Sequence, residues 1–170
     1  MTHNIAFVCS TSYIPPVIAD VALELYHLQL LFDMHLSQEA DVVSGLKLIE
    51  EIERLDLIVM DSELMPGDKT QNAGVEMLCK SFDRKDSLHI RLALHFLKTI
   101  NNSKRNANPP VVVLSNYPQS GPTFFPDIER KFLDAGASKY IHYQRYAIGM
   151  KEGLVCDLTG FLGARASQPY

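Results

Sequence analysis

Two short segments of the sequence are apolar at every position. Residues 57–60 read LIVM and residues 111–114 read VVVL, and a polar residue, Asp61 or Ser115, follows each run directly. Strands that are apolar throughout are typical of parallel sheets, because helices cover both faces of such a sheet. The two runs therefore predict an α/β domain with these segments as central strands.

The remaining segments alternate between the two types of structure. Three more have the composition of strands: residues 4–9, 31–36 and 139–143. Helical spacing of apolar residues follows Pro15-Pro16, begins again at Ser37, and recurs at 74–100, 127–135 and 149–164. The order predicts a doubly wound, flavodoxin-like parallel sheet of five strands in the order 2-1-3-4-5, in three layers. A single domain over residues 1–170 is expected, with an extra helical segment at about 86–100.

Composition excludes several classes of protein. The formal net charge of −4 argues against a broad nucleic-acid surface, and no apolar stretch approaches the ~18 residues of a membrane span. The 3 cysteines are widely spaced and the 6 histidines are scattered, so neither a disulfide framework nor a metal site is predicted. A reducing cytoplasm is the expected compartment.

Ligands of doubly wound sheets bind beyond the carboxyl ends of the strands. The residues predicted to lie there are Cys9 and Ser10, Asp61, Ser115, and Tyr143. We expect Asp61, Ser115 and Tyr143 to line one shallow pocket, with Cys9 and Ser10 on its rim. Residues 10–16 contain no glycine, which counts against a dinucleotide-binding or P-loop enzyme. No catalytic residue and no enzymatic activity are predicted.

Three segments resemble the receiver domains of bacterial response regulators. Residues 56–61 followed by Met65-Pro66 are similar to their phosphoacceptor strand and loop, which makes Asp61 the equivalent of the phosphoacceptor. Residues 111–114 followed by Ser115 resemble the strand with the conserved hydroxyl. Residues 135–140 resemble the stretch that leads into the last strand, with Tyr140 at the aromatic switch position.

The sequence departs from this family at two places that matter for phosphorylation. Receivers hold Mg²⁺ with an acidic pair after the first strand, where this chain has Cys9 and Ser10, and their lysine after the last strand is replaced by Tyr143. Mg²⁺ prefers oxygen ligands that carry charge, and a tyrosine supplies no cation. The resemblance therefore implies a degenerate receiver without a cofactor, with Mg²⁺ bound only if other carboxylates such as Asp20, Glu63 or Asp68 take over.

Three functions remain open at this stage. The first is a stand-alone pseudo-receiver that signals through protein–protein contact, with a sensor kinase or another signalling protein as partner and a possible homodimer through the 127–164 face. The second is an active phosphorelay receiver phosphorylated on Asp61. The third is an unrelated flavodoxin-like ligand binder or enzyme, since a fold alone does not define a function. In ordinary structural roles, Asp61 and Ser115 would end their strands, Tyr140 would be a half-buried aromatic, and Cys9 an inert thiol.

Overall fold

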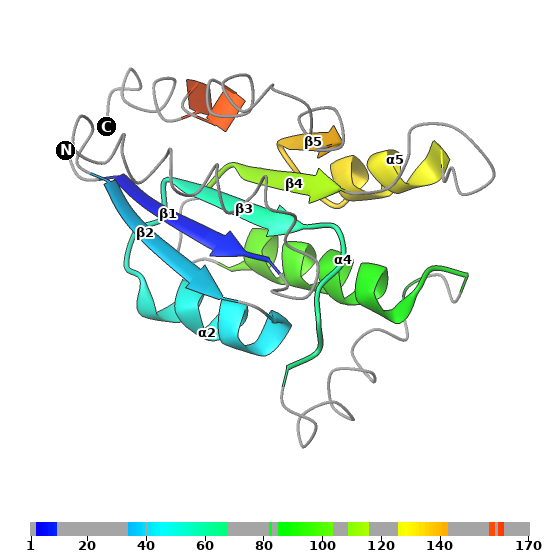
Figure 1. Cartoon of the computed structure of the whole chain (residues 1–170), viewed down its shortest axis with the longest axis horizontal. Helices are drawn as coiled ribbons and strands as arrows, with labels where there is room; N and C mark the ends of the chain where they lie inside the picture. The colour runs from blue at the N-terminus through cyan, green and yellow to red at the C-terminus, as the bar shows by residue number, and fades with distance from the viewer. Residues whose placement is uncertain are drawn as a thin grey trace.

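Five parallel strands form one sheet in the computed structural model (Figure 1). The structure describes residues 3–9, 34–39, 41–67, 82, 85–103, 109–115, 126–142, 157, 158, 160 and 161. The strands are β1 (His3–Val8), β2 (Met34–Glu39), β3 (Leu57–Asp61), β4 (Val111–Ser115) and β5 (Lys139–His142). Their order is β2-β1-β3-β4-β5, and every neighbouring pair is parallel. The predicted strand order is confirmed.

The central strands are buried along their whole length. Every residue of β3 and β4 is buried, as their uniformly apolar sequences predict. Because side chains alternate between the faces of a strand, Ile58 and Met60 join the main core cluster, while Leu57 and Val59 are buried toward the other face. The sheet therefore fixes where Asp61 lies, at the end of a buried strand.

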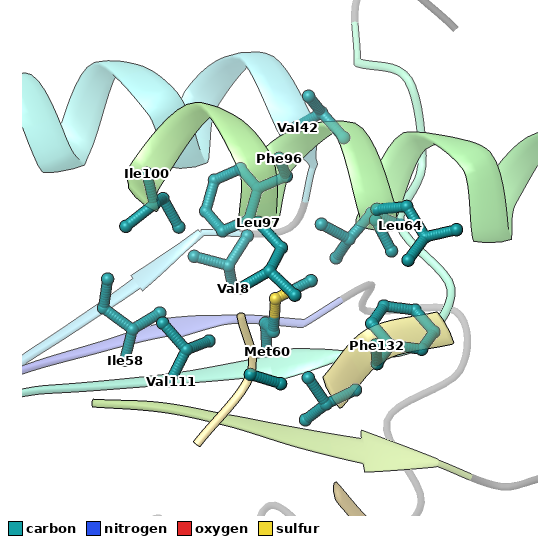
Figure 2. Packing of buried hydrophobic residues seen from close by; sticks show 14 of the residues in the cluster. Val8, Val42, Ile58, Met60, Leu64, Phe96, Leu97, Ile100, Val111 and Phe132 are labelled. Carbon is teal, nitrogen blue, oxygen red and sulfur yellow. The ribbon is translucent and has the colours of Figure 1, made fainter. Parts of the chain in front are cut away.

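The helices α2 (Val42–Glu51) and α4 (Leu88–Asn102) lie together on one side of the sheet (Figure 1). Side chains from these two helices point toward the strands and pack against the apolar residues of β1, β3 and β4 (Figure 2). Phe96 and Leu97 of α4 have no exposed surface. The segment predicted as an extra helix corresponds to α4, which belongs to the β3–β4 connection and packs on this face.

Two boundaries of the sequence-based prediction were wrong. The second strand spans Met34–Glu39, not residues 31–36, and Ser37 lies inside it opposite Ala6 of β1, so it does not begin the next helix. Asp41 is the N-cap of α2, because its carboxylate accepts hydrogen bonds from the backbone N–H and the hydroxyl of Ser44, both at 2.9 Å. Strand β2 continues beyond its apolar residues because its backbone pairs with β1 as far as Glu39.

Helix α5 (Pro126–Asp134) and the turn into β5 agree with the prediction of a glycine cap. Gly136 has a φ of +103°, a conformation that glycine adopts without strain. The N–H of Ala137 bonds to the carbonyl of Phe132 and that of Gly136 to the carbonyl of Leu133, both at 3.0 Å. These are the two bonds of a Schellman motif, which ends the helix and sends the chain into β5.

A buried aspartate joins β1 and β3 at the amino edge of the sheet. Asp56 has no exposed surface, and one carboxylate oxygen accepts from Arg54 Nη2 at 3.0 Å and Nε at 3.1 Å. The other oxygen accepts from the backbone N–H of Asn4 at 3.0 Å. Because a guanidinium and a backbone donor face its two oxygens, this buried carboxylate is compensated.

Several predicted elements fall outside the described residues, among them the helix after Pro15-Pro16. Of the predicted last helix only residues 157, 158, 160 and 161 are described, and they are helical. Asp157 pairs with Lys139 of β5 at 2.9 Å, and Leu158 is fully buried. No helix within the described ranges is long and apolar enough to cross a membrane.

Candidate functional site at the carboxyl edge of the sheet

The carboxyl ends of β1, β3 and β4 bring Cys9, Asp61 and Ser115 to one edge of the sheet. Val8 is in register with Met60 and Asp61 with Leu114, so Cys9 and Asp61 follow paired positions of adjacent strands. The backbone N–H of Ser62 bonds to the carbonyl of Leu114 at 2.8 Å. Pairing therefore continues one residue beyond Asp61 and holds it within the sheet.

The carboxyl group of Asp61 is buried and only partly hydrogen-bonded. The residue is 2% exposed. Its Oδ1 accepts from the backbone N–H of Glu63 at 3.1 Å, whereas Oδ2 is buried without a hydrogen-bond partner. Burial raises the pKa of Asp61 from 3.8 to about 7; the charge of Glu63 also raises it, while the backbone N–H groups of Glu63 and Ser62 lower it. Near neutral pH, a large fraction of Asp61 therefore carries a proton.

Cys9 contributes a neutral thiol beside Asp61. The residue is 1% exposed. Burial raises the pKa of the Cys9 thiol far above its usual range, and the charge of Asp61 raises it further. Only a thiolate is a good nucleophile or metal ligand, and burial disfavours the thiolate form of Cys9 at neutral pH. It also cannot offer the carboxylate that the receiver family has at this position.

Three hydroxyl groups lie next to Asp61. Tyr140 is 8% exposed and packs with its ring centroid 5.6 Å from that of Phe132. Burial raises the pKa of Tyr140 to about 12, the hydroxyls of Ser115 and Ser62 lower it, and the charges of Glu129 and Asp61 raise it. Tyr140 is thus within electrostatic reach of Asp61, and the hydroxyls of Tyr140 and Ser62 are buried without a completed hydrogen bond.

The loop after β3 is anchored to two helices. Leu64 is fully buried, and its N–H bonds to the carbonyl of His89 at 3.3 Å. The carbonyl of Met65 accepts from the N–H of Val42 at 3.0 Å. Gly67 has a φ of +95°, and a side chain there would come within 2.7 Å of the Asp41 carboxylate. Leu64 and Met65 of the loop beside Asp61 are therefore hydrogen-bonded to α4 and α2.

Four of the predicted site residues are described. The charge of Asp61 raises the pKa of both Cys9 and Tyr140, and Ser115 lies beside Tyr140. Ser10 and Tyr143 lie outside the described residues, so the pocket expected between Asp61, Ser115 and Tyr143 stays a prediction. Sequence analysis missed Ser62, which is 1% exposed. Its position directly after Asp61 was the only available signal, because its burial depends on pairing with β4.

The similarity of this chain to known proteins is found in solved structures and not in sequence comparisons. No family model and no curated protein matches the sequence. The receiver domain of a sensor histidine kinase from Pseudomonas aeruginosa, whose structure has a magnesium ion coordinated in the active-site cleft, is 16% identical, with a TM-score of 0.55. That match covers 96% of this chain and 99% of the other.

Two response regulators give similar matches. The receiver domain of a Francisella response regulator is 13% identical, with a TM-score of 0.59, and 96% and 98% of the two chains are covered. A two-component response regulator from Clostridium difficile is 14% identical, also with a TM-score of 0.59, and 98% and 99% are covered. The chain therefore has the fold of response-regulator receiver domains, as its sequence motifs predicted.

The described residues at this edge do not fit a magnesium site. Mg²⁺ in proteins is bound through carboxylates and other hard oxygen donors. The described part of the chain contains no group of three or more His, Cys, Asp or Glu residues arranged for a metal ion. The position after β1 that is acidic in receivers is the buried thiol of Cys9, and burial raises the pKa of Asp61 to about 7, which disfavours the charged carboxylate that Mg²⁺ binds.

Proposed function

We propose that this chain is a receiver-like signalling module that acts through protein–protein contact and is not phosphorylated on Asp61. The observation that carries the proposal is the environment of Asp61. One oxygen of this buried carboxyl has no hydrogen-bond partner, and the neighbour at the first acidic position is the neutral thiol of Cys9. The chain therefore retains the receiver scaffold around a site that is poorly suited to phosphoryl transfer.

The chemistry of phosphoryl transfer supports this reading. The reaction depends on positioning and on neutralising the charge that develops on the phosphoryl group. An attacking aspartate must also be ionised, whereas burial favours the neutral form of Asp61. A protonated carboxyl is not a nucleophile, and Glu63 is the one carboxylate among the described residues whose charge acts on Asp61. The loop after β3 is hydrogen-bonded to α2 and α4, which favours one conformation of this loop over a phosphorylation-dependent change.

An active phosphorelay receiver is the second candidate, and one observation favours it. Asp61 and Ser115 end adjacent strands, and Asp61 is within electrostatic reach of Tyr140, which is the arrangement that the family resemblance implies. The charge of Glu63 also acts on Asp61. In this alternative, Mg²⁺ would be held by Asp61 and Glu63 with further oxygen ligands from residues outside the described ranges.

The partners remain those that the sequence indicates. A sensor kinase or another signalling protein is the expected partner, and the face formed by residues 127–164 is the candidate surface for it or for a homodimer. Leu133 of α5, 43% exposed, is an apolar side chain on that face. A cytoplasmic location, the absence of enzymatic activity and the absence of nucleic-acid binding stay predictions.

Beryllofluoride with Mg²⁺ tests the proposal against the active alternative. Backbone amide spectra would be recorded with and without the phosphoryl mimic, and acetyl phosphate treatment would be followed by intact-mass spectrometry. We expect the intact mass to show no added phosphoryl group. We also expect no shift of the Tyr140 amide signal that is present in the wild type and absent in Asp61→Asn. Asp61→Asn is the matched control, because a change seen in both proteins is unrelated to the carboxylate. Binding at micromolar concentration in the wild type alone would establish an active receiver.

A further inference from the structure

A cavity separate from the Asp61 site opens between α4, α5 and the residues that precede α4. Its volume is about 260 Å³. Leu94 and Lys98 of α4 line it together with Lys131, Asp134 and Ala135 from α5 and its end, and Phe82 and Asp86 form the rest of the wall. None of these residues belongs to the carboxyl edge of the sheet. The volume lies just below the ~300–1,000 Å³ of pockets for drug-sized ligands, so it suits a small molecule.

Two ion pairs account for most of the charge around this cavity. Lys131 Nζ lies 2.7 and 2.8 Å from the two carboxylate oxygens of Asp86, whose side chain is only 10% exposed. The charges of Lys131 and Asp86 neutralise each other, and their ion pair holds one wall of the cavity in place. At the rim, Asp134 pairs with Arg130 on the exposed face of α5 at 3.6 Å. Both carboxylates that line the cavity therefore already face a cation.

Lys98 is the cation that lacks a carboxylate partner among the described residues. Its ammonium lies 4.5 Å from the centroid of the Phe82 ring, which is cation–π geometry. The ring holds the ammonium at the cavity and leaves it able to bind an anion. The cavity wall next to it includes three apolar residues, Phe82, Leu94 and Ala135. A positive charge thus stands beside an apolar wall.

We propose that this cavity binds a small monocarboxylate with an apolar body, such as a short aliphatic or aromatic acid. The carboxylate would pair with Lys98, and the hydrocarbon part would cover Leu94 and Ala135. Charge complementarity selects an anion, and the volume limits its size. Because the cavity shares no residue with the Asp61 site, this binding is independent of whether Asp61 is phosphorylated.

Amide NMR titration with hexanoate tests the proposal, with hexanol as the uncharged ligand of the same length. Hexanoate should shift the amides of Leu94, Lys98 and Ala135 at about millimolar concentration, and hexanol should bind about tenfold more weakly, since it lacks the charge-assisted contact. Equal affinity for the two ligands would overturn the proposal, and so would the absence of shifts at these amides.

Three variants separate the two parts of the site. Lys98→Met keeps the length of the side chain but removes its charge, and should weaken hexanoate binding about tenfold without changing hexanol binding. Ala135→Leu should fill the cavity and weaken both ligands. Lys47→Met is the matched control on α2, where Lys47 is 75% exposed and pairs with Glu51, and should leave hexanoate affinity unchanged. Unchanged hexanoate affinity in Lys98→Met would refute the assignment of the cation.

Discussion

Strand β3 has a buried aspartate at each end, and the two differ in how their charge is compensated. Asp56, just before the strand, receives hydrogen bonds from the guanidinium of Arg54 and the N–H of Asn4. Asp61, the last residue, receives one from Glu63 and has one oxygen without a partner. Burying a carboxylate without partners is costly, so the first aspartate serves the fold and the second is retained at the expense of stability.

Asp56→Asn should produce the largest loss of stability. The amide would place a donor against the guanidinium of Arg54 or the N–H of Asn4, both of which are donors. Breaking a buried, partnered carboxylate costs about 3 kcal/mol. The half-exposed Arg54 recovers some hydration, so a loss of about 2–3 kcal/mol in the free energy of unfolding is expected. Urea denaturation measures it, and a change below about 0.5 kcal/mol would show that Asp56 is not a structural anchor.

The same substitution at Asp61 should act in the opposite direction at alkaline pH. The pKa of Asp61 is raised from 3.8 to about 7 by burial. Between these values the folded state binds more protons than the unfolded state, so the free energy of unfolding falls as pH rises. Asparagine removes this penalty, which for a pKa raised from 3.8 to about 7 is at most about 4 kcal/mol, and should stabilise the protein by about 2–4 kcal/mol at pH 8.

The pH profile provides the control for this prediction. At pH 4 both the wild-type carboxyl and the asparagine are neutral in the folded state, so the two proteins should have similar stability there. The difference should develop between about pH 4 and pH 7 and stay constant above that range. If Asp61→Asn were as destabilising at pH 8 as Asp56→Asn, the contrast between the two ends of β3 would be wrong.

Tyr140→Phe should have the smallest effect. Its hydroxyl is buried near Ser62 and Ser115 but has no completed hydrogen bond, so removing it leaves few groups unpaired. A change within about 0.5 kcal/mol is expected. Ser138→Ala is the comparison, because the Ser138 hydroxyl accepts from Val111 N–H at 3.1 Å, and its loss should cost about 1 kcal/mol. A cost above about 1.5 kcal/mol for Tyr140→Phe would indicate a hydroxyl network around Asp61.

The contrast between the two aspartates also explains what the sequence could predict. The central strands were predictable because a strand that is buried on both faces has an uninterrupted apolar sequence. Strand β2 was misplaced because its position depends on pairing with β1, and Asp41 was missed as a cap for the same reason. The anchor at Asp56 joins residues 52 positions apart, and the burial of Ser62 depends on β4. Local patterns do not contain such contacts.

The pKa of Asp61 itself is the most direct test of this account. Carbon-13 NMR of the side-chain carboxyl, followed from pH 3 to pH 9 and assigned by comparison with Asp61→Asn, would give the value without any ligand. A midpoint of about 7 is the predicted result, because burial disfavours the charged form and none of the groups acting on this carboxyl within the described ranges is a cation. A midpoint at or below about 4 would mean that a compensating cation faces the carboxylate, and would contradict the proposal that this receiver fold signals without phosphorylation.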